Sequence, residues 1–365
     1  MKILLAMSGG VDSSVAAHLL TRKGHEVVGV RFALWNDPKA PAFAKILPSK
    51  CCTTENIHRA NAVAKQLKFP LHRVNLTKEF KKCVVDAYLD AHRRGFTPNP
   101  CVECNRIIKF DHLLRLAKKY GCEKVATGHY ARIARKRLLG GTERSSLLEA
   151  KDRGKDQSYY LYELEQRHLR AALFPLGTLT KRKVLSLAKT FHVPLPDRYI
   201  QSQDLCFFPE KTPHEFLKRH LKRAMKPGNI VRRDGKILGK HEGLPLYTIG
   251  QRRGLRVGGQ RIPLEVVAKD TKGNRLIVAQ KGEETMTTVA LIDMRFTSLR
   301  PKEGVPVRFE CRTRSLSQKK AGTLTLRGEK ALFRFAVPQP LQTPGQSLVL
   351  YRGEEVVGGG VIVSM

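Results

Sequence analysis

The sequence predicts an α/β protein with an N-terminal parallel sheet, a small mixed central domain and a C-terminal β-barrel. Three observations support this fold class. In the first 130 residues, short apolar runs alternate with amphipathic stretches, which is the pattern of strand–helix–strand units joined by right-handed crossovers. A glycine-rich turn separates the first apolar run from the first helical stretch. After Pro227-Gly228, short β-rich runs with glycine turns replace the alternation, as expected for small β modules or a barrel.

Hydrophobic spacing places the elements in order. Strands are expected at 2–7, 26–34, 71–76 and 124–133, and helices at 13–24, 54–68, 77–94 and 105–120. Three prolines make 36–52 a loop, and Gly24 and Gly95 end helices. Residues 155–225 are expected to be mostly helical, including 182–191. The predicted domains are 1–210, 211–280 and 281–365.

Charge and length narrow the classes of function. Lys and Arg number 67 against 32 acidic residues, a formal charge of +35, which favours a polyanionic partner such as nucleic acid. The stretch 211–240 carries ten basic and two acidic residues. The apolar run after Met1-Lys2 is too short for a signal peptide, and no apolar run or amphipathic helix indicates a membrane partner. We therefore expect a cytoplasmic protein whose eight cysteines serve metal binding, catalysis or burial rather than disulfides.

The glycine-rich turn is "SGGVDSS", residues 8–14. Between a strand and a helix, such a turn can direct backbone N–H groups and a helix N-terminus at phosphate, with Ser8, Ser13 and Ser14 adding hydroxyl donors. The Lys of a Walker loop is missing, which disfavours γ-phosphoryl transfer. Asp12 suits such a site if it holds Mg²⁺ or caps a donor. The alternative is an ordinary glycine turn with a helix cap.

The cysteines leave several readings open. "TPNPCVECN" places Cys101 and Cys104 three residues apart, which suits half of a zinc site, a redox pair or a nucleophile with its partner. Cations such as Arg106 and Lys109, or a helix start, would favour the reactive thiolate. Cys206, in "QSQDLCFF", is either exposed on a polar loop or buried beside two phenylalanines.

Two resemblances extend this interpretation. "SGGVDSS" after an N-terminal strand resembles the loop of the ATP pyrophosphatases, which have an adenine nucleotide alpha hydrolase-like fold. Together with it, seven blocks in order resemble the tRNA-specific 2-thiouridylases from end to end: "TPNPCVECNRIIKF", "ATGHYARI", "KDQSYYLYEL", "FPLGTLTK", "QSQDLCFF", "LYTIGQRRGL" and "TPGQSLVLYRGEEVVGGGVI". The resemblance implies ATP-dependent 2-thiolation of the wobble uridine of tRNA, releasing AMP and pyrophosphate.

The resemblance also implies site residues, cofactors and partners. The cofactors are ATP and Mg²⁺, and the partners are tRNA and a sulfur donor such as a cysteine desulfurase or relay protein. Residues implied to bind ATP are Ala6, Met7, Ser8, Gly9, Gly10, Val11, Asp12, Ser13, Phe32 and Gly128. Residues implied to contact tRNA are Asn99, Pro100, Cys101, His129, Lys155, Asp156, Gln157, Arg312, Thr313 and Gln346.

By the same resemblance, Cys206 carries sulfur as a persulfide and Cys104 serves as nucleophile or resolving thiol. Position 101 departs from the family, which often has aspartate there. Three thiolates on Cys101, Cys104 and Cys206 suit a [4Fe–4S] cluster with one open iron, which we favour over a persulfide route with Cys101 a bystander, and over zinc.

The remaining cysteines receive structural expectations. Cys51-Cys52 is expected at a capped helix start in preference to a second metal site, and Cys83, Cys122 and Cys311 are expected in the core. Alternative functions are modification of another tRNA base, amidation of a small molecule, or RNA binding by a non-catalytic metalloprotein.

Overall fold

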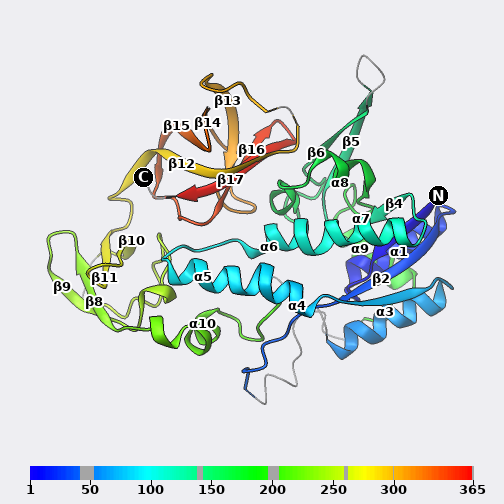
Figure 1. Ribbon diagram of the computed structural model, residues 1–365, viewed down its shortest axis with the longest axis horizontal. Helices are drawn as coiled ribbons and strands as arrows, with labels where there is room; N and C mark the ends of the chain where they lie inside the picture. The colour runs from blue at the N-terminus through cyan, green and yellow to red at the C-terminus, as the bar shows by residue number, and fades with distance from the viewer. Residues whose placement is uncertain (42–52, 138–142, 196–204, 259–261, 299, 364–365) are drawn as a thin grey trace.

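The computed structural model describes residues 1–41, 53–137, 143–195, 205–258, 262–298 and 300–363. Cys51 and Cys52 lie outside these ranges. Three sheets organise the described chain, and Figure 1 shows the barrel and the central sheet on one side of the molecule and the N-terminal parallel sheet on the other. The predicted fold class is confirmed: a parallel sheet, a mixed sheet and a barrel follow one another along the sequence. Within the described ranges, no helix combines the length and apolar character that crossing a membrane requires.

The first sheet is parallel, with strand order β3-β2-β1-β4-β7. Its central strand β1 (Lys2–Ala6) alternates between the two faces, as strand geometry requires. Ile3 and Leu5 pack with helices α1 (Val11–Arg22), α3 (Thr54–Gln66) and α9 (Lys181–Thr190), whereas Leu4 packs on the face covered by α7 (Asp111–Lys119). The other strands are β2 (Glu26–Ala33), β3 (Leu71–Asn75), β4 (Lys124–Ala126) and β7 (Ala172–Leu173).

Two interrupted helices follow β3. The first runs through α4 (Thr77–Phe80), a π-helical segment (Lys81–Asp86) and α5 (Ala87–Arg93). The second runs through α6 (Pro100–Glu103), a π-helical segment (Cys104–Phe110) and α7. The second helix therefore begins at Pro100, not near 105 as expected, because proline has no N–H to lose at the first helical position. Both cysteines of the predicted loop consequently lie on a helix.

The central sheet has the order β10-β11-β8-β9 and mixes parallel and antiparallel pairs. Helix α10 (His214–His220) and two short 3₁₀ turns (Lys222–Ala224 and Leu244–Leu246) accompany it. Its strands are β8 (Gly228–Arg232), β9 (Ile237–His241), β10 (Leu264–Asp270) and β11 (Arg275–Gln280).

The C-terminal barrel closes through pairing of its first and last strands, β12 and β17. Phenylalanines and leucines fill its interior. A hairpin from the N-terminal part, β5 (Arg132–Arg137) and β6 (Glu143–Leu148), extends the barrel sheet by pairing with β17. The barrel strands are β12 (Thr285–Phe296), β13 (Val307–Arg312), β14 (Lys320–Arg327), β15 (Lys330–Pro340), β16 (Ser347–Arg352) and β17 (Glu355–Val363).

Two further expectations on the elements were wrong. The strand expected at 124–133 divides into β4 and β5, because the chain leaves the parallel sheet after Ala126. The described part of 155–225 is less helical than expected: its helical pieces are short, and β7 lies among them as the edge strand of the parallel sheet. The additional pieces are a 3₁₀ turn (Ser158–Leu161) and α8 (Gln166–Ala171).

Candidate functional site

A cavity of about 240 Å³ opens where β1, β2 and β4 end. Strand order reverses at β1, since β2 and β3 lie on one side of it and β4 and β7 on the other. Such a switch point is where open α/β sheets bind ligands. The lining includes seven of the residues expected to bind ATP and two expected to contact tRNA. These are Ala6, Met7, Ser8, Asp12, Ser13, Phe32 and Gly128, and His129 and Gln157.

The glycine turn has the backbone shape that the sequence predicted. Gly10 is the N-cap of α1, and Gly9 has a φ of +78°. A Cβ on Gly9 would lie 1.8 Å from the carbonyl oxygen of Asn56, so α3 packs directly behind the turn. Arg59 of the same helix is buried and donates from Nη1 to the Gly9 carbonyl over 2.7 Å. The turn is therefore braced from behind and presents the N-terminus of α1 to the cavity.

Asp12 has two partners that sequence reasoning did not identify. Its Oδ1 accepts a hydrogen bond from the Tyr130 hydroxyl over 2.8 Å and lies 2.6 Å from Lys181 Nζ. Lys181 begins α9 after its N-cap Thr180. The ammonium offsets the carboxylate charge, which makes Asp12 compatible with a neighbouring anion. Tyr130 and Lys181 lie in "ATGHYARI" and "FPLGTLTK", two of the blocks that resemble the 2-thiouridylases. That resemblance is the signal that could have identified them.

The chain after β4 packs closely against the glycine turn. A Cβ on Gly128 would lie 2.9 Å from Ser13 N and 3.0 Å from the Asp12 carbonyl carbon. His129 Nδ1 lies 2.7 Å from Thr127 Oγ1. Burial, with a smaller contribution from Lys109, lowers the pKa of His129 well below its ordinary value. The imidazole is therefore neutral near pH 7.

The opposite wall of the cavity is apolar. Phe32, for which the family resemblance implies ATP binding, lines it together with Val30, Leu34 and Ile108, for which it implies none. Lys109 also lines the cavity and donates to Asn105 Oδ1 over 2.8 Å. The cavity thus joins an apolar side suited to a purine ring with a helix N-terminus and cations suited to phosphates.

The structure brings two of the three expected cysteines to one hydrophobic cluster. Cys104 is buried within that cluster, and half-buried Cys206 packs against it. Ile108 belongs to the same cluster and Phe32 packs against it, so the cluster borders the cavity directly. Cys101, half-buried on α6, is not a member. In the described ranges, no three His, Cys, Asp or Glu side chains gather as metal ligands would.

The segment that follows Cys206 is anchored by charge. Asp37, whose side chain is fully buried, accepts hydrogen bonds from Arg219 Nη2 at 2.6 Å and from His220 Nε2 at 2.9 Å. Burial would raise the pKa of Asp37, but these hydrogen bonds outweigh it and lower the pKa. Arg219 also pairs with Glu210. Helix α10 is thereby fixed to the chain after β2, close to Cys206 in sequence.

Several residues expected to contact tRNA are engaged within the protein. Asp156 is 2% exposed and pairs with Arg312 Nη1 over 3.1 Å. Arg312 also pairs with buried Glu149 over 2.8 Å. These ion pairs connect the barrel to the N-terminal part of the chain. Gln346 Nε2 donates to the carbonyls of Thr97 and Pro98 over 2.8 and 3.3 Å.

The remaining expected tRNA contacts lie at other surfaces. Asn99 and Pro100 line a cavity of about 270 Å³ between α5, α6 and the barrel. Thr313 lines a groove of about 530 Å³ between the central sheet and the barrel, with Arg252 and Arg314. Lys155 is exposed.

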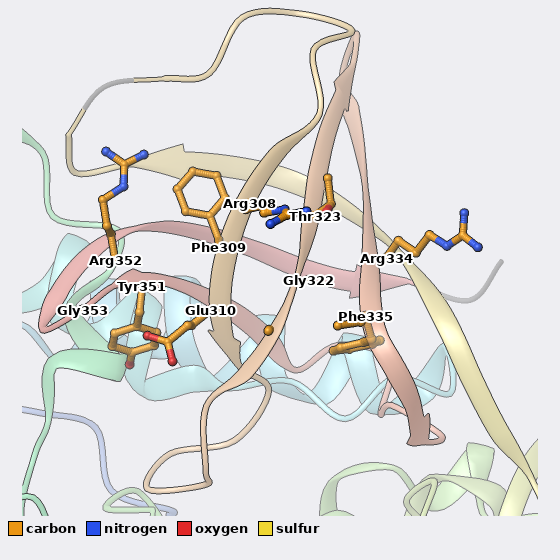
Figure 2. Close-up of a pocket in the computed structure, with 12 residues that line it drawn as sticks. Arg308, Phe309, Glu310, Gly322, Thr323, Arg334, Phe335, Tyr351, Arg352 and Gly353 are labelled. Carbon is orange, nitrogen blue, oxygen red and sulfur yellow. The ribbon is translucent and has the colours of Figure 1, made fainter.

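A larger depression, of about 730 Å³, lies on the barrel. Figure 2 shows its side chains on strands β13, β14 and β15 and at the end of β16. Arg308, Arg334 and Arg352 are exposed there, and Glu310 is the acidic residue among the lining. The depression offers cations to an anionic surface, but its lining has no cysteine and no glycine turn at a helix start. It is therefore a poorer candidate for chemistry than the cavity at β1.

Comparisons with known proteins cover nearly the whole chain. Three family models match in succession: "tRNA methyl transferase HUP domain" over residues 1–210, "tRNA methyl transferase PRC-barrel domain" over 214–280 and "Aminomethyltransferase beta-barrel domain" over 286–362. Among solved structures, the U34-tRNA thiolase NcsA from Methanococcus maripaludis with its [4Fe-4S] cluster is 18% identical with a TM-score of 0.34, covering 57% of this chain and 61% of that one. That likeness is too low to carry an argument.

Relatives of similar length are much closer in sequence. The tRNA-specific 2-thiouridylase MnmA of Geobacter metallireducens is 41% identical over 364 residues, covering 99% of this chain and 96% of the relative. That of Carboxydothermus hydrogenoformans is 39% identical, covering 99% and 97%. Identity at this level across nearly the whole length establishes descent from a common ancestor, and the chain belongs to the tRNA-specific 2-thiouridylase family.

Proposed function

We propose that this protein replaces O2 of the wobble uridine of tRNA with sulfur, consuming ATP and releasing AMP and pyrophosphate. The observation that carries the proposal is that the cavity at the glycine turn and the cluster around the cysteines share a wall. Phe32 and Ile108 line the cavity at the glycine turn. Ile108 also belongs to the cluster that contains Cys104, and Phe32 packs against that cluster. A nucleotide in the cavity would therefore contact the same hydrophobic cluster that the thiols contact. The relatives' name, tRNA-specific 2-thiouridylase, supports the same reaction.

The cavity supports a specific orientation of ATP. The adenine would pack against Phe32 and Ile108, and the phosphates would face the N-terminus of α1, where backbone N–H groups and the helix dipole stabilise anions. Lys109 and Lys181 would add positive charge. Asp12 could hold Mg²⁺, because this ion typically binds through one or two carboxylates plus the phosphates of the substrate. Bound there, Mg²⁺ would neutralise charge on the phosphates during adenylation.

The uridine must leave its stack to reach this site, because its O2 is otherwise inaccessible. We propose that it enters beside His129, because the neutral imidazole can form a hydrogen bond with the base. The basic stretch 211–240 and the arginines of the barrel depression would bind RNA phosphates, which gives affinity without sequence selectivity. Transfer of AMP to O2 turns that oxygen into a leaving group.

The donor set supports a cysteine relay more strongly than an iron–sulfur cluster. A cluster needs three or four thiolates in one place, and the described residues contain no such group. We therefore propose that Cys206 receives sulfur from a persulfide-bearing donor protein. The terminal sulfur of the Cys206 persulfide attacks C2 as AMP leaves. The Cys104 thiolate then attacks the Cys206 sulfur, which releases 2-thiouridine and forms a Cys104–Cys206 disulfide, and a thiol reductant restores both thiols.

The reaction is tested with a tRNA transcript, ATP and a persulfide donor. We expect AMP, pyrophosphate and 2-thiouridine in equal amounts, measured by chromatography and by mass spectrometry of the nucleosides. A transcript with cytidine at the wobble position should give no thiolated product. Because two family descriptions name methyl transfer, a parallel reaction contains S-adenosylmethionine in place of ATP. Methylated tRNA in that reaction, or AMP release without thiolation in the first, would refute the proposal.

The sulfur carrier is tested by purification without oxygen. We expect little iron or acid-labile sulfide, and thiolation that survives Cys101→Ala but is lost in Cys104→Ala and Cys206→Ala. About four iron and four sulfide per chain, lost in Cys101→Ala together with thiolation, would establish a [4Fe–4S] enzyme in place of the relay.

A further inference from the structure

The peptide that leads into the cysteine helix is held mainly by distant parts of the chain. Residues 95–99 connect α5 to α6, and we name them the 95–99 segment. From the barrel, Gln346 Nε2 donates to the carbonyls of Thr97 and Pro98, and the Pro344 carbonyl accepts from Thr97 N over 2.9 Å. From the central sheet, Lys269 Nζ donates to the Gly95 carbonyl over 3.0 Å.

The composition of the 95–99 segment explains why it depends on outside support. Pro98, like Pro100 after it, has no N–H and cannot join a hydrogen-bonded turn as a donor. Each proline also keeps the residue before it out of the helical region, and Asn99 has a φ of −111° and a ψ of 82°. The segment therefore cannot extend the helix backward. Its carbonyls need donors from elsewhere, and Gln346 donates to two of them, those of Thr97 and Pro98.

The barrel turn that carries Gln346 is itself fixed closely against the segment. Gly345 has a φ of +92°, and a Cβ there would lie 2.9 Å from Thr97 N. The Gln346 carbonyl accepts from Ile362 N over 2.8 Å, which ties the turn to β17. Thr343 Oγ1 donates to the Ile249 carbonyl over 3.1 Å, which ties it to the chain after β9. Gln346 thus reaches the segment from a rigid base.

We propose that Gln346 is a positioning residue for the catalytic cysteine helix, so that the C-terminal barrel completes the site as well as binding RNA. The hydrogen bonds to Thr97 and Pro98 fix where α6 begins. That start in turn sets where Cys101 and Cys104 lie, because they occupy the first turns of the helix. This role rests on the proposed function of Cys104, and it differs from the direct tRNA contact that the family resemblance implies for Gln346.

The test uses Gln346→Glu, which keeps the shape of the side chain but replaces the Nε2 donor by a carboxylate oxygen. The matched control is Gln342→Glu, in the same barrel turn, where the side chain donates to the Pro340 carbonyl within its own strand end. Both variants add one negative charge to the same turn between β15 and β16. Gln346→Lys, which keeps a donor within reach of the two carbonyls, serves as the rescue variant and guards against a general folding defect.

The first measurement is the alkylation rate of Cys104 by iodoacetamide, followed by peptide mass spectrometry without ATP or tRNA. Because Cys104 is buried, release of the helix start in Gln346→Glu should raise this rate on the order of tenfold. The rate at Cys206, the internal reference, should stay unchanged. Gln342→Glu and Gln346→Lys should resemble the wild type.

The second measurement is thiolation kinetics. We expect Gln346→Glu to lower kcat while the KM for tRNA stays equal to that of Gln342→Glu. An unchanged Cys104 alkylation rate together with a raised KM for tRNA would overturn the proposal and make Gln346 an RNA contact. If the wild type failed to thiolate tRNA at all, the proposed function would fall, but the alkylation result would still decide the positioning role.

Discussion

Replacing Gly128 by alanine should slow AMP formation, because the added Cβ would clash with the backbone of the glycine turn. The added Cβ would lie 2.9 Å from Ser13 N, whereas ordinary contacts begin at 3.4 Å. The strand end and the glycine turn must therefore separate by about 0.5 Å, the difference between those distances. Neither side yields easily, because the neighbours are backbone atoms and Arg59 holds the turn from behind.

The expected effect has two parts. Overpacking of this kind typically costs about 1–3 kcal/mol of stability. If the glycine turn binds phosphate as proposed, a shift of half an ångström there should also slow AMP formation on the order of tenfold, because reaction rates depend steeply on the placement of the reacting groups. We expect the KM for ATP to rise as well, since the turn meets the nucleotide in its ground state.

The assay measures AMP release with saturating tRNA, together with urea denaturation. Gly239→Ala is the matched control, because a Cβ there would meet Val257 at an ordinary 3.7 Å in the central sheet. Wild-type rates and a wild-type KM for ATP in Gly128→Ala would refute the reasoning, since they would mean that the turn tolerates the displacement. A large loss of stability with normal ATP kinetics in the folded fraction would refute the second part alone.

Two further predictions test the site and the fold. Lys181→Met should lower AMP formation on the order of a hundredfold, because it removes the ammonium 2.6 Å from Asp12, whereas Lys183→Met, exposed on the same helix, should be neutral in the same assay. Burial lowers the pKa of His92 to about 4, so the unfolded chain binds this proton first as pH falls. Its contribution to stability should therefore be complete above pH 6.5 and decline toward pH 4 by about 3 kcal/mol. The free energy of unfolding, measured by denaturation across that range, should depend less on pH in His92→Gln than in the wild type. An unchanged pH dependence would contradict this role of His92.

Local patterns predicted the parts of the fold that neighbouring residues determine. The glycine turn was predictable because strand, Ser-Gly-Gly and helix follow within a few positions, and the spacing of apolar residues marks both elements. The helix that begins with α6 was expected to start near residue 105, several residues beyond its actual start. Pro100 indicates the true start, because proline favours the first turn of a helix. The division of 124–133 into two strands was not predictable, because it depends on β5 pairing with β6 and on β6 pairing with the barrel.

The hydrogen-bond partners of the site residues could not be predicted from the sequence, because they lie far away along the chain. Lys181 lies 169 positions from Asp12, and Tyr130 lies 118 positions away. Sequence periodicity cannot pair such residues, since it indicates which face of a strand or helix is buried but not which residues pack against that face. The family resemblance implied which residues contact ATP and tRNA, but it could not indicate that Asp156 and Arg312 are paired with each other.

The long-range contacts explain why the two cysteines need the whole chain. Cys104 sits on a helix whose start is held by Gln346 of the barrel and, through Gly95, by Lys269 of the central sheet. Cys206 precedes a helix that is fixed to the chain after β2 by the buried carboxylate of Asp37. A sulfur relay requires both thiols to approach one carbon in turn, so errors in either placement reduce the rate. Because different parts of the protein hold each thiol, the proposed binding of RNA across the barrel and the central sheet would act on the geometry of the proposed relay as well as on affinity.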